Sequence, residues 1–250
     1  MRNPRRQGES NVYHIIARGT GKQLIFEDDQ DRIKFLSFMS QACREAHVEL
    51  YAWCLMGNHF HLLASAPIED ISSFIKKLCG WYARYFNDRH GRTGHLFQER
   101  FRSEPVESDE YLMTVVRYIH RNPDNSGIGR YDTYPWSSYS EYIGTERYCS
   151  TDFVLSLFGT IDEFIAMHAL DVEENGCMEL GCRLRPSNPV DDEVALAIAR
   201  RTLGDIPVSD VKIFERGRRD ALLRKLKDSG LSIRNIERIT GISRSVIGRA

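Results

Sequence analysis

The sequence predicts an α+β chain: a ferredoxin-like antiparallel sheet with helices on one face, followed by a C-terminal all-α helix-turn-helix domain. Between residues 12 and 122, strand-like and helix-like segments follow one another in the order β-α-β-β-α-β, with one added helix. Near the C-terminus, two short helical patterns flank a glycine. We therefore expect three parts, namely a domain over residues 1–148, an acidic connector with short helices over 149–190, and a helical domain over 191–250.

The elements of the first domain follow from local patterns. Segments rich in β-branched and aromatic residues predict strands over 12–19, 48–55, 59–66 and 95–106, the last with a basic face. Apolar residues at helical spacing predict helices over 28–46, about 70–87 and 110–120. Asp70 or Ser72 is expected to cap the second helix, and Pro123 is expected to end the third. The turn-rich, aromatic residues 124–150 are expected to wrap the sheet edge.

The last sixty residues predict helices only. Helices are expected over 191–202 and 209–229. Ser232 then caps a helix with Ile233, Ile236 and Ile239 facing inward, Gly241 makes the turn, and Ser243 caps a helix with Val246 and Ile247 inward. This pattern is typical of a helix-turn-helix, with arginines on the outer face. The alternative is a helical hairpin that serves only packing.

Composition places the chain among reduced, cytoplasmic proteins. Of its 250 residues 42% are hydrophobic, no apolar run is long enough to span a bilayer, and the basic N-terminus lacks the apolar segment of a signal peptide. The six cysteines form no Cys-x-x-Cys pair. Lys and Arg balance Asp and Glu, 19 to 19, over residues 1–150, whereas residues 151–200 carry 3 against 10 and residues 201–250 carry 12 against 6. This asymmetry predicts a nucleic-acid-binding appendage and a nucleoid-associated protein; the alternative is two solvated surfaces of opposite sign.

The third predicted strand carries two histidines two positions apart. Alternate side chains of a strand point to opposite faces, so His59 and His61 share one face, about 7 Å apart along the backbone. Phe60 and Leu62 face the core on the other side. Imidazole nitrogens are good ligands for divalent metals, and two of them on one strand form half of a coordination shell. The alternative is a pair of partly exposed strand histidines without a metal.

The helix over 110–120 and the residues just after it can supply what the histidines lack. Tyr118 and Asn122 are four residues apart, which places them on one helical face. A tyrosine oxygen can attack a phosphodiester when a metal polarises the phosphate, and an amide oxygen is a ligand that Mg²⁺ or Mn²⁺ accepts. If this helix crosses the open sheet face, Tyr118 and Asn122 meet His59 and His61. The alternative for Tyr118 is an ordinary packed tyrosine.

Taken together, these motifs resemble those of a known family. The sequence is similar to the single-tyrosine (Y1) HUH transposases of the IS200/IS605 type, and most closely to the REP-associated tyrosine transposases. The resemblance covers roughly residues 10–145 and rests on four ordered motifs: NHFHLL over 58–63, GHLFQERF over 94–101, YIHRNP over 118–123 and WSSY over 136–139.

The resemblance implies a mechanism. A divalent ion, Mg²⁺ or Mn²⁺, held by His59, His61 and Asn122 would polarise a phosphate of single-stranded DNA, and Tyr118 would attack it to leave a 5′-phosphotyrosine link and a free 3′-OH. Insertion-sequence members carry Gln at the third ligand position, so Asn122 is one methylene shorter and resembles the REP-associated branch. His120 could compete as a ligand, although its helical position turns it off the shared face.

The implied partner is hairpin DNA with a single-stranded flank, as in REP-like palindromes, and the chain could form a homodimer. Basic residues are the expected phosphate contacts, and stem contacts are assigned to the C-terminal domain, which could equally serve oligomer contacts. The DNA-contact candidates are Arg5, Arg6, Arg18, Arg100, Arg102, Arg234, Arg244, Ser245 and Arg249.

Two other functions remain open from the sequence. The chain could be a non-catalytic, sequence-specific DNA-binding regulator derived from a transposase, which would bind DNA without covalent chemistry. It could also be an RNA phosphodiesterase on the same frame, but such enzymes carry two separate His-x-Thr/Ser motifs. Leu62 and Leu63 follow His61, and no second motif is present.

Overall fold

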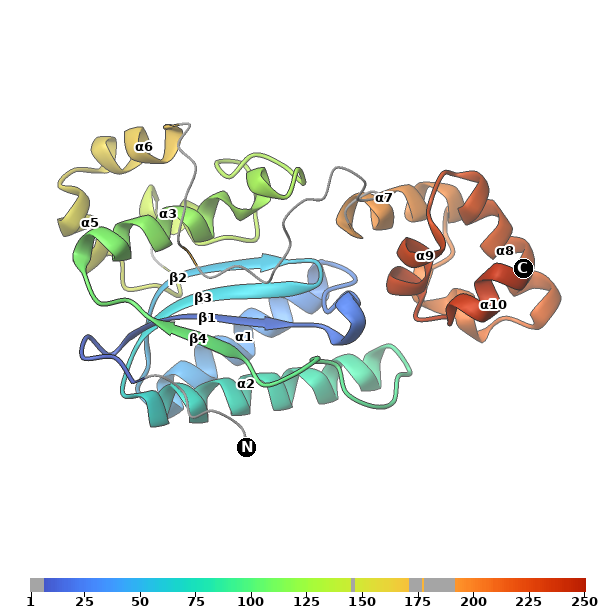
Figure 1. Cartoon of the computed structure of the whole chain (residues 1–250), viewed down its shortest axis with the longest axis horizontal. Helices are drawn as coiled ribbons and strands as arrows, with labels where there is room; N and C mark the ends of the chain where they lie inside the picture. The colour runs from blue at the N-terminus through green and yellow to red at the C-terminus, as the bar shows by residue number, and fades with distance from the viewer. Residues whose placement is uncertain (1–6, 145–146, 171–176, 178–191) are drawn as a thin grey trace.

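The first domain is built on a four-stranded antiparallel sheet. The structure, a computed structural model, describes residues 7–144, 147–170, 177 and 192–250. The strand order is β2-β3-β1-β4, and each neighbouring pair is antiparallel (Figure 1). The strands are β1 (Val12–Arg18), β2 (Glu49–Met56), β3 (His59–Ser65) and β4 (Arg102–Pro105). This order confirms the ferredoxin-like prediction.

Two long helices, α1 (Asp29–Ala46) and α2 (Ile68–Arg89), cover one face of the sheet (Figure 1). Phe60 and Leu62 of β3 are fully buried in this layer, as are Phe35 of α1 and Phe74 of α2. Asp28 begins α1 by accepting a hydrogen bond from the Asp31 amide. The strand alternation that sends Phe60 and Leu62 into this core therefore sends His59 and His61 to the opposite face.

The opposite face is not open, which corrects the expectation that helices lie on one side only. Helix α3 (Asp109–Asn125) crosses β2 and β3 there (Figure 1). Its apolar residues recur at helical spacing, and Leu112, Val115 and Ile119 form a second core with Cys54 and Met56 of β2. The short helices α5 (Asp152–Phe158) and α6 (Ile161–Ala169) pack against α3 and contribute to this core.

Strand four was predicted too long. Ordered pairing with β1 runs only over Arg102–Pro105, and Phe97 forms a single isolated bridge with Gly19. The reason is that β1 ends at Arg18 and the chain turns into the 3₁₀ segment η1 (Thr20–Lys22), so residues 95–101 have no strand to follow.

Two predicted helix boundaries were also wrong. Helix α2 begins at Ile68, with Pro67 at the N-cap position and no side-chain cap. Helix α3, which Ser108 caps by accepting from the Tyr111 amide, continues through Pro123 to Asn125. Its end is held by hydrogen bonds from the Ser126 amide to the Asn122 carbonyl and from the Ile128 amide to the Pro123 carbonyl.

The C-terminal domain is entirely helical, as predicted. It comprises α7 (Asp192–Leu203), η2 (Val208–Ile213), α8 (Arg216–Asp228), α9 (Ile233–Thr240) and α10 (Arg244–Arg249). Gly241 adopts the left-handed conformation between α9 and α10, and Ser232 caps α9. The single helix expected over 209–229 is broken, since Lys212 donates to the His90 carbonyl at 3.0 Å and draws η2 onto the first domain.

Smaller corrections concern the helix-turn-helix itself. Ile233 is 40% exposed rather than inward, and the Ser243 side chain makes no cap bond to the α10 backbone. Leu24 of the first domain is buried in the core of the C-terminal domain, so the two domains share a packed contact. The expected boundaries at residues 148 and 190 stay predictions, and most of the acidic connector lies outside the described residues.

Residues 136–138 extend the sheet edge beside β2, as expected of the turn-rich segment. The Leu55 amide donates to the Trp136 carbonyl at 2.8 Å, and the Ser138 amide donates to the Trp53 carbonyl at 2.9 Å. Ser138 Oγ also accepts from the Trp53 amide at 2.9 Å and contacts His120 Nε2 at 2.8 Å. This hydroxyl therefore fastens α3 to the edge of the sheet.

The described helices include none with the length and apolar character needed to cross a bilayer. The five described cysteines are free thiols.

Ser138→Ala is expected to destabilise the protein by about 1–3 kcal/mol, because it leaves the buried Trp53 amide without its side-chain acceptor and His120 without a partner. Urea unfolding measures this change. Ser137→Ala is the matched control, since the buried Ser137 Oγ has no hydrogen-bond partner and its removal should be neutral or stabilising. Equal destabilisation by both substitutions would contradict the assignment.

Candidate active site

Strand register brings three histidines to the face beneath α3. His61 is paired directly with Ile16 of β1, and His14 lies two residues before Ile16 on the same strand face. The His14 and His61 rings are stacked with centroids 5.3 Å apart, and the His59 and His61 centroids are 5.0 Å apart. The structure thus confirms that His59 and His61 share a face, and it adds His14 to them.

The Nδ1 atom of each of the two histidines predicted to bind metal contacts another side chain of the protein. His59 Nδ1 donates to the Asn58 side-chain oxygen at 2.6 Å, which leaves Nε2 of His59 with its lone pair. His61 Nδ1 lies 3.0 Å from His14 Nε2. When the Nδ1–H of His61 donates across this contact, Nε2 of His61 also keeps its lone pair.

The surroundings hold these imidazoles neutral. Burial lowers the pKa of His14 to about 3. Burial, with a contribution from the positive charge of Arg18, lowers the pKa of His59 to about 3 and the pKa of His61 well below 6.5. Neutral imidazole is the form that binds metals, so His59 and His61 both have the protonation state that a metal requires at neutral pH.

Helix α3 brings Tyr118 onto the histidines within a single chain. The Tyr118 ring meets the rings of His61 and His14 edge-on, with centroids 5.7 Å and 5.8 Å away. Tyr118 is 8% exposed, and Asn122, one turn later, is 5% exposed. The amide nitrogen of Asn122 donates to the Tyr118 carbonyl at 3.0 Å, so its side-chain oxygen is the atom that remains to face a ligand.

His120 is excluded from this group by its own contacts. His168 Nδ1 donates to the Phe164 carbonyl at 2.9 Å, so His168 Nε2 accepts, and His120 Nδ1 must donate to it across 3.0 Å. His120 Nε2 is then the acceptor for the Ser138 hydroxyl. Both nitrogens are thus used in packing α3.

The basic residues expected to contact DNA fall into separate places. Arg18 is paired directly with His59, and Arg102 is paired with Ile16, the partner of His61, so both lie in strand rows on the histidine face. Arg100 is exposed outside β4, and Arg5 and Arg6 lie outside the described residues. The helix-turn-helix candidates Arg234, Arg244, Ser245 and Arg249 are all exposed. Arg244 pairs with Glu237, and Arg249 donates to the Ser245 carbonyl at 2.9 Å.

The histidines supply only part of the donor set that a divalent ion requires. Over the described residues, no three His, Cys, Asp or Glu side chains are grouped as a metal site. The chemistry of the donors nevertheless fits, because the Nδ1 atom of each imidazole contacts a protein partner. Nε2 of His59 is then available, and Nε2 of His61 is available when His61 Nδ1 donates to His14. An amide oxygen and substrate or water oxygens would have to complete the shell.

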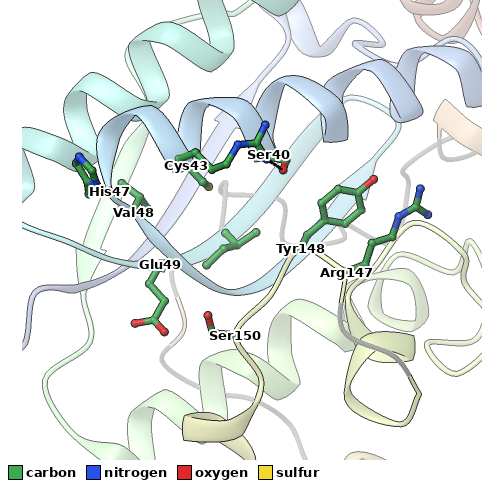
Figure 2. Close-up of a pocket in the computed structure, with 10 residues that line it drawn as sticks. Ser40, Cys43, His47, Val48, Glu49, Arg147, Tyr148 and Ser150 are labelled. Atoms are coloured by element: carbon green, nitrogen blue, oxygen red, sulfur yellow. Dashed lines mark hydrogen bonds between the residues drawn. The ribbon is translucent and has the colours of Figure 1, made fainter.

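Two cavities of the structure lie elsewhere. One, of about 420 Å³, lies between α1, the start of β2 and residues 147–150, and is lined by Arg44, His47 and Tyr148 among others (Figure 2). The other, of about 450 Å³, is lined by Ile75, Cys79 and Phe101 among others, on the α2 side. His59, His61 and Tyr118 line neither of these two cavities.

Sequence reasoning missed His14, Asn58 and Asp192 as members of the site. The signal for His14 was available, because the predicted strand order places strand one beside the His-x-His strand and His14 alternates with Ile16. Asn58 entered the sequence analysis only as the first residue of the NHFHLL motif, yet its side chain touches His59 and, at 2.8 Å, the Asp192 carboxylate. The contact with Asp192 spans 134 residues and has no local signal.

Parts of this chain are similar to known proteins. Residues 9–122 match the family model described as "Transposase IS200 like". A protein from Haemophilus influenzae described as "Putative REP-associated tyrosine transposase" is 26% identical over 129 residues, which are 46% of this chain and 72% of that protein. A solved structure of a REP-associated tyrosine transposase bound to a REP hairpin aligns with a TM-score of 0.49 and 18% identity, over 57% of this chain and 85% of that one.

The buried histidines predict that stability falls with acidification. The unfolded chain takes up protons near pH 6.5, whereas the folded-state pKa of His14 is about 3, so stability is lost as the pH drops from about 6.5 toward 3. Each such histidine contributes a slope of at most about 1.4 kcal/mol per pH unit. Urea unfolding at several pH values should show a shallower slope for His14→Gln. The same shallowing in a variant of the exposed His95 would contradict this assignment.

Proposed function

We propose that the chain is a metal-dependent single-stranded DNA endonuclease and strand transferase that acts through Tyr118, because residues 9–122 match the model of the IS200-like transposases. The observation that carries the proposal is the edge-on contact of Tyr118 with His61 at 5.7 Å within one chain. The proposed nucleophile is therefore in contact with one of the proposed metal ligands, His61, before any metal or DNA is bound. Activity in this arrangement requires no exchange of helices between protomers, although a homodimer is compatible with it.

His59, His61 and the Asn122 side-chain oxygen would hold the divalent ion, Mg²⁺ or Mn²⁺. When bound, the ion supplies Lewis-acid polarisation of the scissile phosphate. The protein contributes orientation, because Asn58 and His14 hold the Nδ1 atoms of the two imidazoles and α3 fixes Asn122 beside Tyr118. Arg18 and Arg102 flank the histidines with positive charge, where the backbone of a DNA strand would pass.

The proposed chemistry conserves the phosphodiester bond energy. Tyr118 Oη attacks phosphorus in line and loses its proton, the bond from phosphorus to the 3′ oxygen breaks, and that oxygen leaves as a 3′-OH after taking up a proton. The 5′-phosphate remains on Tyr118. Attack by a 3′-OH reverses the step and rejoins strands without ATP, which suits strand transfer at hairpin-flanked sites such as REP-like palindromes.

The competing function is a DNA-binding regulator that has lost the chemistry. The exposed arginines of α9 and α10 would serve both functions equally, so DNA binding alone does not separate them. Covalent chemistry does separate them.

Incubating the protein with labelled hairpin DNA carrying single-stranded flanks and Mn²⁺ is expected to give a protein–DNA adduct that survives denaturing electrophoresis. Tyr118→Phe should abolish it, because the attacking oxygen is gone. Tyr111→Phe is the control, since Tyr111 lies on the same helix and its hydroxyl bonds to Glu104 at 3.1 Å. An adduct that persists in Tyr118→Phe would exclude this nucleophile, and no adduct across many hairpins would favour the regulator.

Arg102→Ala is expected to weaken binding of single-stranded DNA and to reduce the dependence of log K on log salt by about 0.7, the value for one lost phosphate contact. Fluorescence anisotropy over a salt series measures both effects. Arg84→Ala removes the same charge from an exposed position on α2, across the sheet from the histidines, and should leave the slope unchanged. Equal slopes for wild type and Arg102→Ala would remove Arg102 from the DNA path.

A further inference from the structure

A chain of polar contacts joins the metal-facing strand to the C-terminal domain. His59 Nδ1 lies 2.6 Å from Asn58 Oδ1, and the Asn58 amide nitrogen lies 2.8 Å from Asp192 Oδ2. The other carboxylate oxygen of Asp192 lies 2.8 Å from Arg238 Nε in an ion pair. Asp192 begins α7, and Arg238 lies on α9, the first helix of the helix-turn-helix.

The direction of each hydrogen bond in this chain is fixed by chemistry. An ionised carboxylate only accepts, so Asn58 must turn its NH₂ group toward Asp192. The oxygen of the same amide then points to His59, and an amide oxygen also only accepts. His59 must therefore carry its proton on Nδ1 and keep a lone pair on Nε2. Asp192 thus determines the tautomer of His59 through two successive hydrogen bonds.

Burial makes this selection strong. Asn58 is 9% exposed and Asp192 is 3% exposed, so water competes little for their polar groups. A buried carboxylate requires a partner of opposite charge, which Arg238 supplies. If Asp192 is removed, the Asn58 NH₂ group loses its shorter contact and is left with the Lys22 carbonyl at 3.5 Å, so the amide is oriented less firmly and either of its ends can face His59.

We propose that Asp192 of the C-terminal domain is a positioning residue of the metal site, which holds His59 in the metal-binding tautomer through Asn58. The inference rests on the proposed function for the identity of the site, but the tautomer itself exists without metal or DNA. The C-terminal domain is then part of the active centre as well as a DNA-binding unit. Outer partners of metal-bound histidines commonly change metal affinity by about 10–100-fold when they are removed.

The test uses the full chain and two readouts that need no turnover. Long-range ¹H–¹⁵N NMR of the metal-free protein reports the tautomer of His59, and calorimetric titration with MnCl₂ reports metal affinity. Wild type should show His59 protonated on Nδ1. Asp192→Ala should give mixed tautomers and at least about tenfold weaker Mn²⁺ binding. A wild-type tautomer together with wild-type affinity in Asp192→Ala would overturn the proposal.

Asp220→Ala is the matched control, because Asp220 lies in the same domain and pairs with Arg219 at 3.1 Å, not with Asn58. It should behave as wild type, and a loss equal to that of Asp192→Ala would indicate a general effect of the domain and overturn the proposal. Asp192→Asn has nearly the same shape and serves as the second variant if Asp192→Ala fails to fold. Arg238 takes its only side-chain oxygen, so its NH₂ group faces Asn58 and the preference of His59 for a proton on Nδ1 should be lost. A folded Asp192→Asn with the wild-type tautomer would contradict the hydrogen-bond argument.

The two claims fail separately. If the protein binds no Mn²⁺ and forms no adduct, the proposed function is wrong while the NMR comparison still reports on Asp192. If metal binding and adduct formation persist in Asp192→Ala with an unchanged tautomer, only the positioning role is wrong.

Discussion

Contacts between buried imidazoles organise the interface between the sheet and α3, where His14 Nδ1 is itself buried without a hydrogen-bond partner. Two imidazole pairs lie there, His14 with His61 and His120 with His168, each joined by a nitrogen–nitrogen contact of 3.0 Å. In such a pair one ring donates and the other accepts, so the tautomer of one fixes the tautomer of the other. The pairs differ in the ring nitrogens that are not used in the contact between the two rings. In the His120–His168 pair these nitrogens are hydrogen-bonded to a serine hydroxyl and a backbone carbonyl. In the His14–His61 pair, one of them is His61 Nε2, the proposed metal-binding atom.

This difference separates the histidine that packs α3 from the histidines that are proposed to bind a metal. His120 is used at both nitrogens and fastens α3 to β2, which keeps Tyr118 against the strand histidines. His59 and His61 each have Nδ1 engaged, by Asn58 and His14 respectively. The same helix that carries the proposed nucleophile is therefore fixed by residues that take no part in the proposed chemistry. Stability and function share this interface, since the groups that orient the site are also buried there.

The sequence was sufficient for features that depend on local periodicity. Strand alternation placed His59 and His61 on one face, and helical spacing placed Tyr118 and Asn122 on another element that could meet them. It failed where long-range packing decides. The break before α8 contains no proline or glycine and follows from the Lys212 contact with the His90 carbonyl. The Asn58–Asp192 contact likewise depends on how two domains dock, which no local pattern encodes.

The central claim is that His59 and His61 present Nε2, with the Asn122 oxygen, to one divalent ion beside Tyr118. The most direct measurement is an anomalous difference map from crystals soaked in MnCl₂. The account predicts one peak within bonding distance of both Nε2 atoms and of the Asn122 side-chain oxygen. A peak on His59 and His61 without Asn122 would remove the third ligand. A peak bound through Nδ1, or no peak at these histidines at saturating Mn²⁺, would contradict the account.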